Sequence, residues 1–334
     1  DIDNGSIDNC GITSITLSKD SFDCSHVGIN TVQMTVTDVN GNSDTCSAQV
    51  TVVDSILPVA ICMDTTVYLS ASGSVTITTT YIDNGSNDNC LLDSVRLSRY
   101  IFDCSNVGAN VIQLYAYDSQ GNIDSCQSTV TVLDTTRPVA NCIDTTIYIT
   151  GTGSVTIDSS YVNNSMTAGC AISSIHLSKS TFSCIDTGVN IVTMLVTDVN
   201  GNQDSCQSRV TVLDTIKPIV SCQSITVYLN SLGEAIIDSS DIDNGSIDNC
   251  GITSITLSKD SFDCSHVGIN TVQMTVTDVN GNSDTCSAQV TVVDNTKPTV
   301  FCRDTVLYLD AFGVSVIDSS FINNNSFDNC DISS

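Results

Sequence analysis

The sequence predicts an all-β chain, organised as a tandem array of β-sandwich domains with an 80-residue period. Cysteines stand at 10, 24, 46 and 62 and return 80 residues later at 90, 104, 126 and 142. Between them, Val, Ile and Thr alternate with polar residues in short runs bounded by Gly, Asn and Asp clusters, which is typical of half-buried strands. Glu234 is the only Glu beside 36 Asp, and this disfavours helices, whose surfaces use Glu freely.

Linkers of the form Asp-x-x-x-Pro divide the chain into units. They lie at 54–58, 134–138, 214–218 and 294–298. A period close to the size of an independent sandwich favours separate domains over a solenoid. We therefore predict complete repeats at 55–134, 135–214 and 215–294, a partial repeat without its start at 1–54 and one without its end at 295–334. Residues 1–54 recur unchanged at 241–294, and we expect the chain to be a window on a longer array.

Each repeat contains about seven predicted strands. In residues 55–134 they fall at 59–62, 65–69, 75–78, 91–97, 101–102, 111–117 and 128–133. Asn-Gly pairs at 40–41, 200–201 and 280–281 predict hairpin turns between the last two strands of their repeats. A tyrosine recurs at one strand position, at Tyr68, Tyr148, Tyr228 and Tyr308, and we predict that it belongs to the core.

Composition excludes several classes of function. The formal charge of −27 opposes binding to nucleic acid or anionic lipid, because both need Lys and Arg to neutralise phosphates. No apolar run approaches the roughly 20 residues of a membrane helix, so we expect no membrane insertion. The three histidines do not share a context with a nucleophile across the repeats, and no Gly-rich phosphate loop occurs. We predict that the protein is not an enzyme and has no catalytic residues.

The four cysteines of each repeat predict disulfides, because no Cys-x-x-Cys pair and no zinc spacing is present. Disulfides indicate an oxidising, extracellular location. Three pairings are possible in a repeat. First and last strands that start at one pole favour Cys62 with Cys126, which leaves Cys90 with Cys104, although an extended strand after Cys90 would oppose that second pair. The copies would be Cys142–Cys206, Cys170–Cys184, Cys222–Cys286, Cys250–Cys264 and Cys10–Cys24, while Cys46, Cys302 and Cys330 would find partners outside the chain.

Two acidic loops per repeat predict calcium sites at the domain junctions. Hard oxygen ligands at alternate positions, as in 38–44 and its copies, suit Ca²⁺. The alternative is that these residues only close turns. The candidate ligands are Asp54, Asp83, Asp88, Asp118, Asn122, Asp124, Asp134, Asp198, Asp204, Asp214, Asp243, Asp248, Asp278 and Asp284. In the repeat 135–214 the loop 163–169 has lost its acids, so we expect weak or no binding at that junction.

The pattern of these motifs resembles the hyalin repeat (HYR), an immunoglobulin-like extracellular domain. The residues that carry the resemblance are Pro-x-x-x-Cys at the start, Phe-x-x-x-x-x-Gly from Phe22 and Phe102, Asp-x-x-Gly-Asn-x-x-x-Cys, and a final Val-x-Val-x-Asp. The tandem form, with its Asp-Thr-Thr-x-Pro linkers, is similar to arrays in large secreted adhesins of Bacteroidota. The resemblance implies a tandem immunoglobulin-like fold and an adhesive or structural role at the cell surface, without catalysis.

We predict from these observations a disulfide-locked, calcium-stiffened rod or filament on the cell surface. Its partners would be further repeats of the same chain, with lateral self-association. The alternative is an array of modules that bind surface glycans or proteins through exposed loops. O-glycans in Bacteroidota follow Asp-Ser/Thr-apolar or Asp-Thr-Thr sequences, so a glycoprotein is expected, with candidate sites at Thr65, Thr135, Thr145, Thr215 and Thr305.

Overall fold

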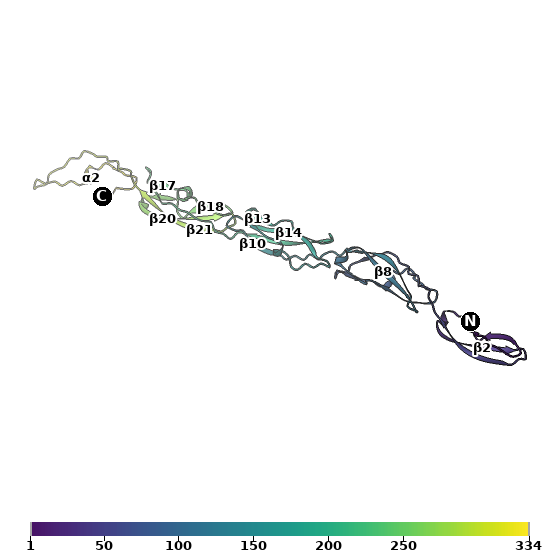
Figure 1. Ribbon diagram of the computed structural model, residues 1–334. Coiled ribbons are helices and arrows are strands. Elements are labelled where there is room, and N and C mark those ends of the chain that lie inside the picture. The colour runs from purple at the N-terminus through teal and green to yellow at the C-terminus, as the bar shows by residue number, and fades with distance from the viewer. Residues whose placement is uncertain (1, 333–334) are drawn as a thin grey trace. The chain divides into compact units, whose positions relative to one another are not determined.

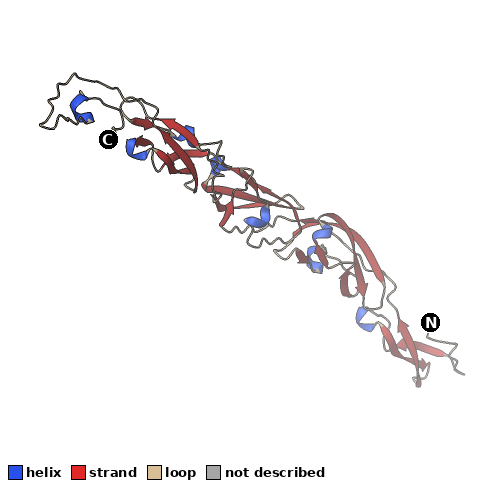
Figure 2. Ribbon diagram, turned by 90° about the vertical axis from the view of Figure 1, so that its left-hand side faces the viewer, coloured by secondary structure: helices blue, strands red, loops and turns tan. Residues whose placement is uncertain are grey.

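The protein is described by a computed structural model over residues 2–332. Strands dominate it, and the helices are single short turns, as Figure 2 shows. The chain divides into two compact units, one of residues 1–140, 165–175 and 195–205 and the other of 141–164, 176–194 and 206–334. The division therefore passes through the repeat 135–214. The predicted all-β fold class is confirmed, as a series of sandwich-like repeats with an 80-residue period.

The repeat 55–134 shows how one unit is built. Its elements are β4 (Thr65–Tyr68), β5 (Ser74–Thr76), η2 (Thr79–Tyr81), β6 (Leu92–Leu97), β7 (Ile101–Asp103), η3 (Cys104–Asn106), β8 (Gly108–Asp118) and β9 (Ile123–Leu133). One sheet has the order β4-β9-β8-β6, in which β4 and β9 are parallel and the other pairs antiparallel. A second sheet pairs β5 with β7.

The next two repeats have the same strand order. Their strands β14 and β20, which correspond to β8, are labelled with it in Figure 1. Repeat 135–214 has β10 (Thr145–Tyr148), β11 (Ser154–Thr156), η4 (Ser159–Tyr161), β12 (Ile172–Leu177), β13 (Thr181–Ser183), η5 (Cys184–Asp186), β14 (Gly188–Asp198) and β15 (Gln203–Leu213). Repeat 215–294 has β16 (Ile225–Tyr228), β17 (Glu234–Ile236), α1 (Ser239–Ile242), β18 (Ile252–Leu257), β19 (Ser261–Asp263), η6 (Cys264–His266), β20 (Gly268–Asp278) and β21 (Ser283–Val293). The ends contribute β1 (Ile12–Leu17), η1 (Cys24–His26), β2 (Gly28–Asp38), β3 (Ser43–Val52) and α2 (Ser319–Ile322).

The predicted strand at 59–62 is wrong as a continuous element. Val59 and Cys62 make only isolated bridges, to Asn87 and Asp83, so the repeat has six strands. Pro58 has no backbone N–H to donate to a sheet, and the short segment after it pairs with the polar loop 83–89 instead of with the edge of a sheet. The Asn-Gly pairs lie in hairpin turns, and Gly41 has the positive φ of 89° that such turns need.

The core of each repeat lies between the larger sheet and the pair of short strands. From Ile112 in β8 and from Ser128 to Val132 in β9 every second side chain is buried, which is the period of a strand with one packed face. Phe102 of β7 and Leu114 of β8 are fully buried in the core cluster of residues 55–134. Equivalent clusters form around Phe262 and Met274 in residues 215–294.

The prediction that the repeated tyrosine is a core residue is wrong. Tyr68, Tyr148 and Tyr228 are 56–58% exposed and Tyr308 is 87% exposed. In β4 the buried side chains are those of Val67 and, one residue after the strand, Leu69. Because neighbouring residues of a strand face opposite ways, the tyrosine points outward. The recurrence of an aromatic residue therefore marked a surface position.

Candidate functional site

The first kind of disulfide lies within a repeat. It joins the segment before the first strand to the last strand, as in Cys62–Cys126, where the Cα atoms are 5.9 Å apart. The copies are Cys142–Cys206 and Cys222–Cys286. These three pairs agree with the pairing favoured from the sequence.

The second kind of disulfide joins neighbouring repeats, and here the sequence prediction is wrong. The pairs are Cys24–Cys90, Cys104–Cys170, Cys184–Cys250 and Cys264–Cys330, and each spans 66 residues. They replace the expected Cys90–Cys104, Cys170–Cys184, Cys250–Cys264 and Cys10–Cys24 pairs, and Cys330 has its partner within the chain. Cys10, Cys46 and Cys302 are free and exposed among the described residues.

The geometry of β6 explains the correction. After Cys90 the chain runs through this six-residue strand, which extends by roughly 20 Å, before it turns back as β7 into η3 and Cys104. Cys104 therefore lies at the end of its repeat that faces the next one, where its Sγ is 3.5 Å from the carbonyl oxygens of both Gly73 and Gly169. The extended strand β6 therefore separates Cys90 from Cys104, as the sequence had indicated.

The inter-repeat disulfide is built into the junction. Cys170 is only 5% exposed and belongs to the core cluster of the preceding repeat, 55–134. Gly73, in the turn before β5, has a φ of 73°, and a Cβ there would lie 2.2 Å from the carbonyl oxygen of Gly169. Glycine is required at this position both by its left-handed backbone and by the close approach of the next repeat's cysteine loop.

Three carboxylates meet at the junction that precedes residues 215–294. Asp214 comes from the linker, Asp248 from the loop before Cys250, and Asp278 from the end of β20. One carboxylate oxygen of each lies within 4.8 Å of the others. Asp54, Asp88 and Asp118 form the same trio two junctions earlier, and we call these two groups the carboxylate trios.

Backbone hydrogen bonds hold each trio carboxylate in place. Asp248 Oδ2 accepts from the backbone nitrogens of Cys250 and Gly251 at 2.7 and 3.1 Å. Its Oδ1 is buried and has no hydrogen-bond partner. Asp214 is 8% exposed, accepts from Ile216 N through Oδ1, and likewise leaves its buried Oδ2 without a partner. Such orphaned anionic oxygens are costly unless a cation joins them.

Asp118 and its copies have a second, purely structural task. Asp118 Oδ1 accepts from the backbone nitrogens of Gln120 and Asn122, and Oδ2 accepts from the Asn122 amide. Burial raises the pKa of Asp118, but the hydrogen bonds from Asn122 and the loop backbone outweigh it, so that pKa lies below its ordinary value of 3.8. The carboxylate is therefore held in the anionic form that a metal ligand needs.

The junction at Asp134 differs in its chemistry from the two that carry the carboxylate trios. Ala168 and Gly169 stand where the other repeats have Asp and Asn. Asp134 there accepts a 2.8 Å hydrogen bond from the Asn200 amide, while Asp198 keeps the loop bonds of Asp118. The Asn200 amide thus contacts the linker carboxylate, Ala168 supplies no third acid, and no trio forms among the described residues at this junction.

Five of the other predicted ligands serve turns or local backbone contacts. Asp83 and Asp243 accept from the backbone nitrogens of Ser86 and Ser246. Asp124 and Asp204 accept from Ala60 and Ala140, and Asp284 from the next residue, Thr285. Asn122 donates to the backbone oxygen of Asp54 and fastens the linker to the hairpin. Asp83 and Asp124, which were also candidates to gather with Asp54, belong to neither carboxylate trio.

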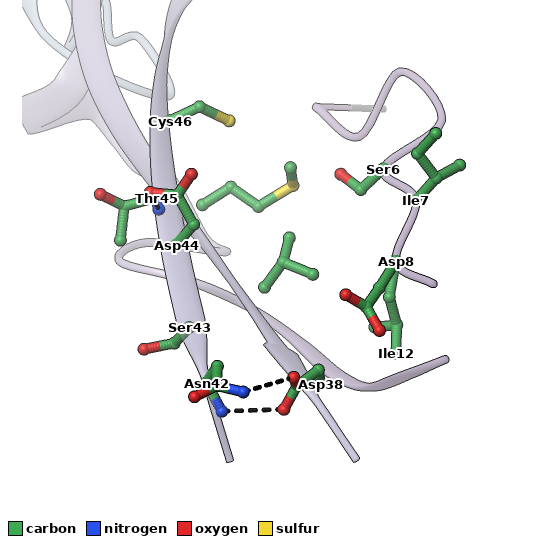
Figure 3. A pocket seen from close by; sticks show the side chains of 12 residues that line it. Ser6, Ile7, Asp8, Ile12, Asp38, Asn42, Ser43, Asp44, Thr45 and Cys46 are labelled. Carbon is green, nitrogen blue, oxygen red and sulfur yellow. Dashed lines mark hydrogen bonds between the residues drawn. The ribbon is translucent and has the colours of Figure 1, made fainter. Parts of the chain in front are cut away.

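The hairpin aspartate is less buried in residues 1–54 than in the identical segment 241–294. In Figure 3, Asp38 accepts from Asn42 and lines a hollow with Ile12 and Cys46. In the identical segment 241–294, Cys286, the copy of Cys46, is bonded to Cys222. The copy of Asp38, Asp278, falls to 1% exposure there. The linker and first strands thus bury the hairpin acid.

The carboxylate trios fit a hard divalent cation. Each trio supplies three carboxylates. In the trio of residues 214, 248 and 278, Asp214 and Asp248 each have one buried oxygen that accepts no hydrogen bond from the protein. Ca²⁺ prefers such oxygen ligands and completes its six to eight with water or carbonyl groups. Among the described residues no cysteine or histidine joins either trio, which disfavours softer metals.

Two features could not be recognised as functional from the sequence. The inter-repeat pairing was one, and its only signal was the extended strand between Cys90 and Cys104. The exposed tyrosine position was the other.

The candidate glycosylation sites lie on the surface or partly so: Thr135, Thr215 and Thr305 are exposed, while Thr65 and Thr145 are half-buried at strand starts.

Comparison with known proteins agrees with this architecture. Residues 133–212 and 213–292 each match the family model described as the HYR domain. The curated relative Hyalin of Strongylocentrotus purpuratus is 29% identical over 237 residues, which is 68% of this chain and 20% of that protein. An uncharacterized 81.3 kDa protein of Acholeplasma phage L2 is 30% identical over 39% of this chain and 18% of its own length. The chain thus spans about a fifth of the length of each relative.

Solved structures resemble the chain only loosely. Drosophila N-cadherin EC1-4 has a TM-score of 0.28 at 11% identity, covering 86% of this chain and 93% of its own. Sidekick-1 immunoglobulin domains 1-4 have a TM-score of 0.29 at 10% identity, covering 82% and 84%. No helix in residues 2–332 has the length and apolar character to cross a bilayer. Residues 133–292 are thus similar to two HYR domains in tandem.

Proposed function

We propose that the chain is an extracellular structural repeat protein whose HYR units are joined into a rod or filament that carries adhesive surfaces, and that it performs no catalysis. The observation that carries this proposal is the disulfide between each repeat and its neighbour. A covalent bond at every junction fixes neighbours to each other, which a set of independently acting domains does not need. Seven disulfides also fit an oxidising location outside the cytoplasm.

The proposal includes calcium at the carboxylate trios. The trios sit where a linker, a loop and a hairpin of two repeats meet, so a bound cation would hold these three segments together. Asp54, Asp88 and Asp118 would hold one ion and Asp214, Asp248 and Asp278 another. The ion would supply only electrostatic bridging. Stiffening would then vary along the chain, because the junction at Asp134 has no trio.

Calcium titration tests this part. We expect two Ca²⁺ per chain by isothermal calorimetry, with Kd values of about 10⁻⁴–10⁻³ M, the range of extracellular modules. Asp248→Asn should reduce the count to one, because it removes a charge from one trio. Asp284→Asn is the matched control, since Asp284 lies outside the trio in the same repeat, and it should leave two ions. Unchanged binding in Asp248→Asn would rule out the assignment.

A second candidate function follows from the exposed tyrosines. A row of equivalent aromatic side chains at 68, 148, 228 and 308 provides apolar faces that stack on sugar rings. This supports the alternative of a glycan-binding array. Replacing Tyr68, Tyr148 and Tyr228 by Ser should strongly reduce glycan retention, because only Tyr308 remains, without changing calcium binding. If the triple variant retains glycans as well as the parent chain does, the row has no such role.

The proposal places the rod on the surface of a cell, as the resemblance of its linkers to those of large Bacteroidota adhesins implies. Lateral association of rods and O-glycans at the five candidate threonines remain predictions within this proposal. Divalent ions would assist association, since the charge of −27 keeps chains apart in solution.

A further inference from the structure

The two kinds of disulfide overlap along the sequence. Cys62–Cys126 begins inside the loop closed by Cys24–Cys90, and Cys104–Cys170 begins before Cys126 is reached. The same interleaving continues through the remaining pairs to Cys330. Each disulfide loop therefore shares a stretch of chain with the next loop.

This overlap leaves no backbone position between Cys24 and Cys330 outside a disulfide loop. The linker 126–142 is spanned by Cys104–Cys170 and the linker 206–222 by Cys184–Cys250. Conversely, the stretches 90–104 and 170–184 are spanned by the pairs within repeats. If all pairs lay within repeats, a cut in a linker would sever the chain.

We infer that the interleaved disulfides make the array a two-track covalent strand, which no single backbone cleavage between Cys24 and Cys330 can sever. One track runs through the inter-repeat pairs and 14-residue links such as 90–104. The other runs through the pairs within repeats and 16-residue linkers such as 126–142. The function is resistance to proteolytic severing and to stretching, as needed by a tether in a protease-rich medium. The tensile part rests on the proposed structural role, whereas the tolerance of cuts stands independently.

Packing at the junctions covers some cysteines of the inter-repeat disulfides. Cys170 lies in the core cluster of the preceding repeat, and Cys330 packs against the cluster of residues 215–294. The Gly153 turn approaches the Asn249 carbonyl oxygen as the Gly73 turn approaches Gly169. A disulfide exchanges by thiolate attack on an accessible sulfur, so this packing limits exchange at the buried Cys170, whereas Cys24 is exposed.

Complete tryptic digestion of the unfolded, unreduced chain tests the inference. Free thiols are blocked, the protein is denatured, and trypsin cuts after Lys19, Arg96, Arg99, Lys179, Arg209, Lys259 and Arg303, since Arg137, Lys217 and Lys297 precede proline. We expect one disulfide-linked species that contains 20–96, 100–179, 180–209, 210–259, 260–303 and 304–334. Reduction should release the six peptides together.

The cut after Arg209 distinguishes the pairings. Only Cys184–Cys250 holds the two sides of that cut together, because Cys142–Cys206 lies before it and Cys222–Cys286 after it. Separate species ending at 209 and beginning at 210, with 304–334 released, would overturn the inference. Such a result would leave calcium binding at the trios untouched, so the two proposals fail by different measurements.

Discussion

Reduction of disulfides should release about 900 Å of additional length when the chain is stretched from its ends. The shortest covalent path from Cys24 to Cys330 uses four disulfides and three 14-residue links, 42 residues in place of 306. At about 3.5 Å per extended residue, the oxidised chain reaches about 170 Å between these cysteines and the reduced chain about 1,070 Å. Single-molecule force spectroscopy of the oxidised and reduced protein measures the difference directly.

Two double variants provide a matched pair for this experiment. Cys104→Ser with Cys170→Ser removes one link of the shorter track, and rerouting through the pairs within repeats adds 38 residues, about 130 Å. Cys142→Ser with Cys206→Ser also removes one disulfide but leaves the shorter track intact, so the oxidised length should not change. Equal lengthening in both variants would contradict the two-track arrangement.

Phe102→Ala should destabilise the repeat 55–134 by about 3–5 kcal/mol. The ring is fully buried in β7, next to Val75 across the short sheet, and lies under the Arg99 guanidinium at 5.0 Å. Truncation leaves a cavity between the two sheets that the small core of an 80-residue domain cannot close. Hydrogen exchange by mass spectrometry, read on peptides from β8 and β9, measures the loss of protection.

The control for this variant is Tyr68→Ala in the same repeat. Tyr68 is 58% exposed, so its removal should change the protection of β8 and β9 by no more than about 0.5 kcal/mol. A similar loss in both variants would mean that the tyrosine contributes to packing after all. The comparison thus also tests the surface assignment of the tyrosine row.

The fold could be predicted because its signals are local. Alternation in 111–117 and the Asn-Gly turns depends on side chains within one hairpin, and the structure places β8 and the turns there. The first pairing followed in the same way, since Cys62 and Cys126 lie within one repeat. The second pairing could not follow, because Cys104 has its partner in a neighbour, and reasoning inside one repeat never considers that neighbour.

The carboxylates show a similar division. Asp54, Asp88 and Asp118 come together as expected from their places at one pole, and the junction with the altered loop at Ala168 has no trio among the described residues. Asp83 and Asp124 were indistinguishable from them by type. What separates them is the path of each loop, which brings Asp88 and Asp118 to the linker carboxylate but directs Asp83 to Ser86 and Asp124 to Ala60.

The inter-repeat bond also has a consequence for biosynthesis. Cys104 is translated long before Cys170, and during that interval the nearest available thiol along the chain is Cys90, only 14 residues behind it. Short loops close most readily in an unfolded chain, so this premature pair is entropically favoured until the next repeat emerges. Each repeat must therefore keep one thiol in reserve for its successor, or exchange a temporary bond for the final one. Efficient production of the chain should depend on a disulfide isomerase in the compartment where it folds.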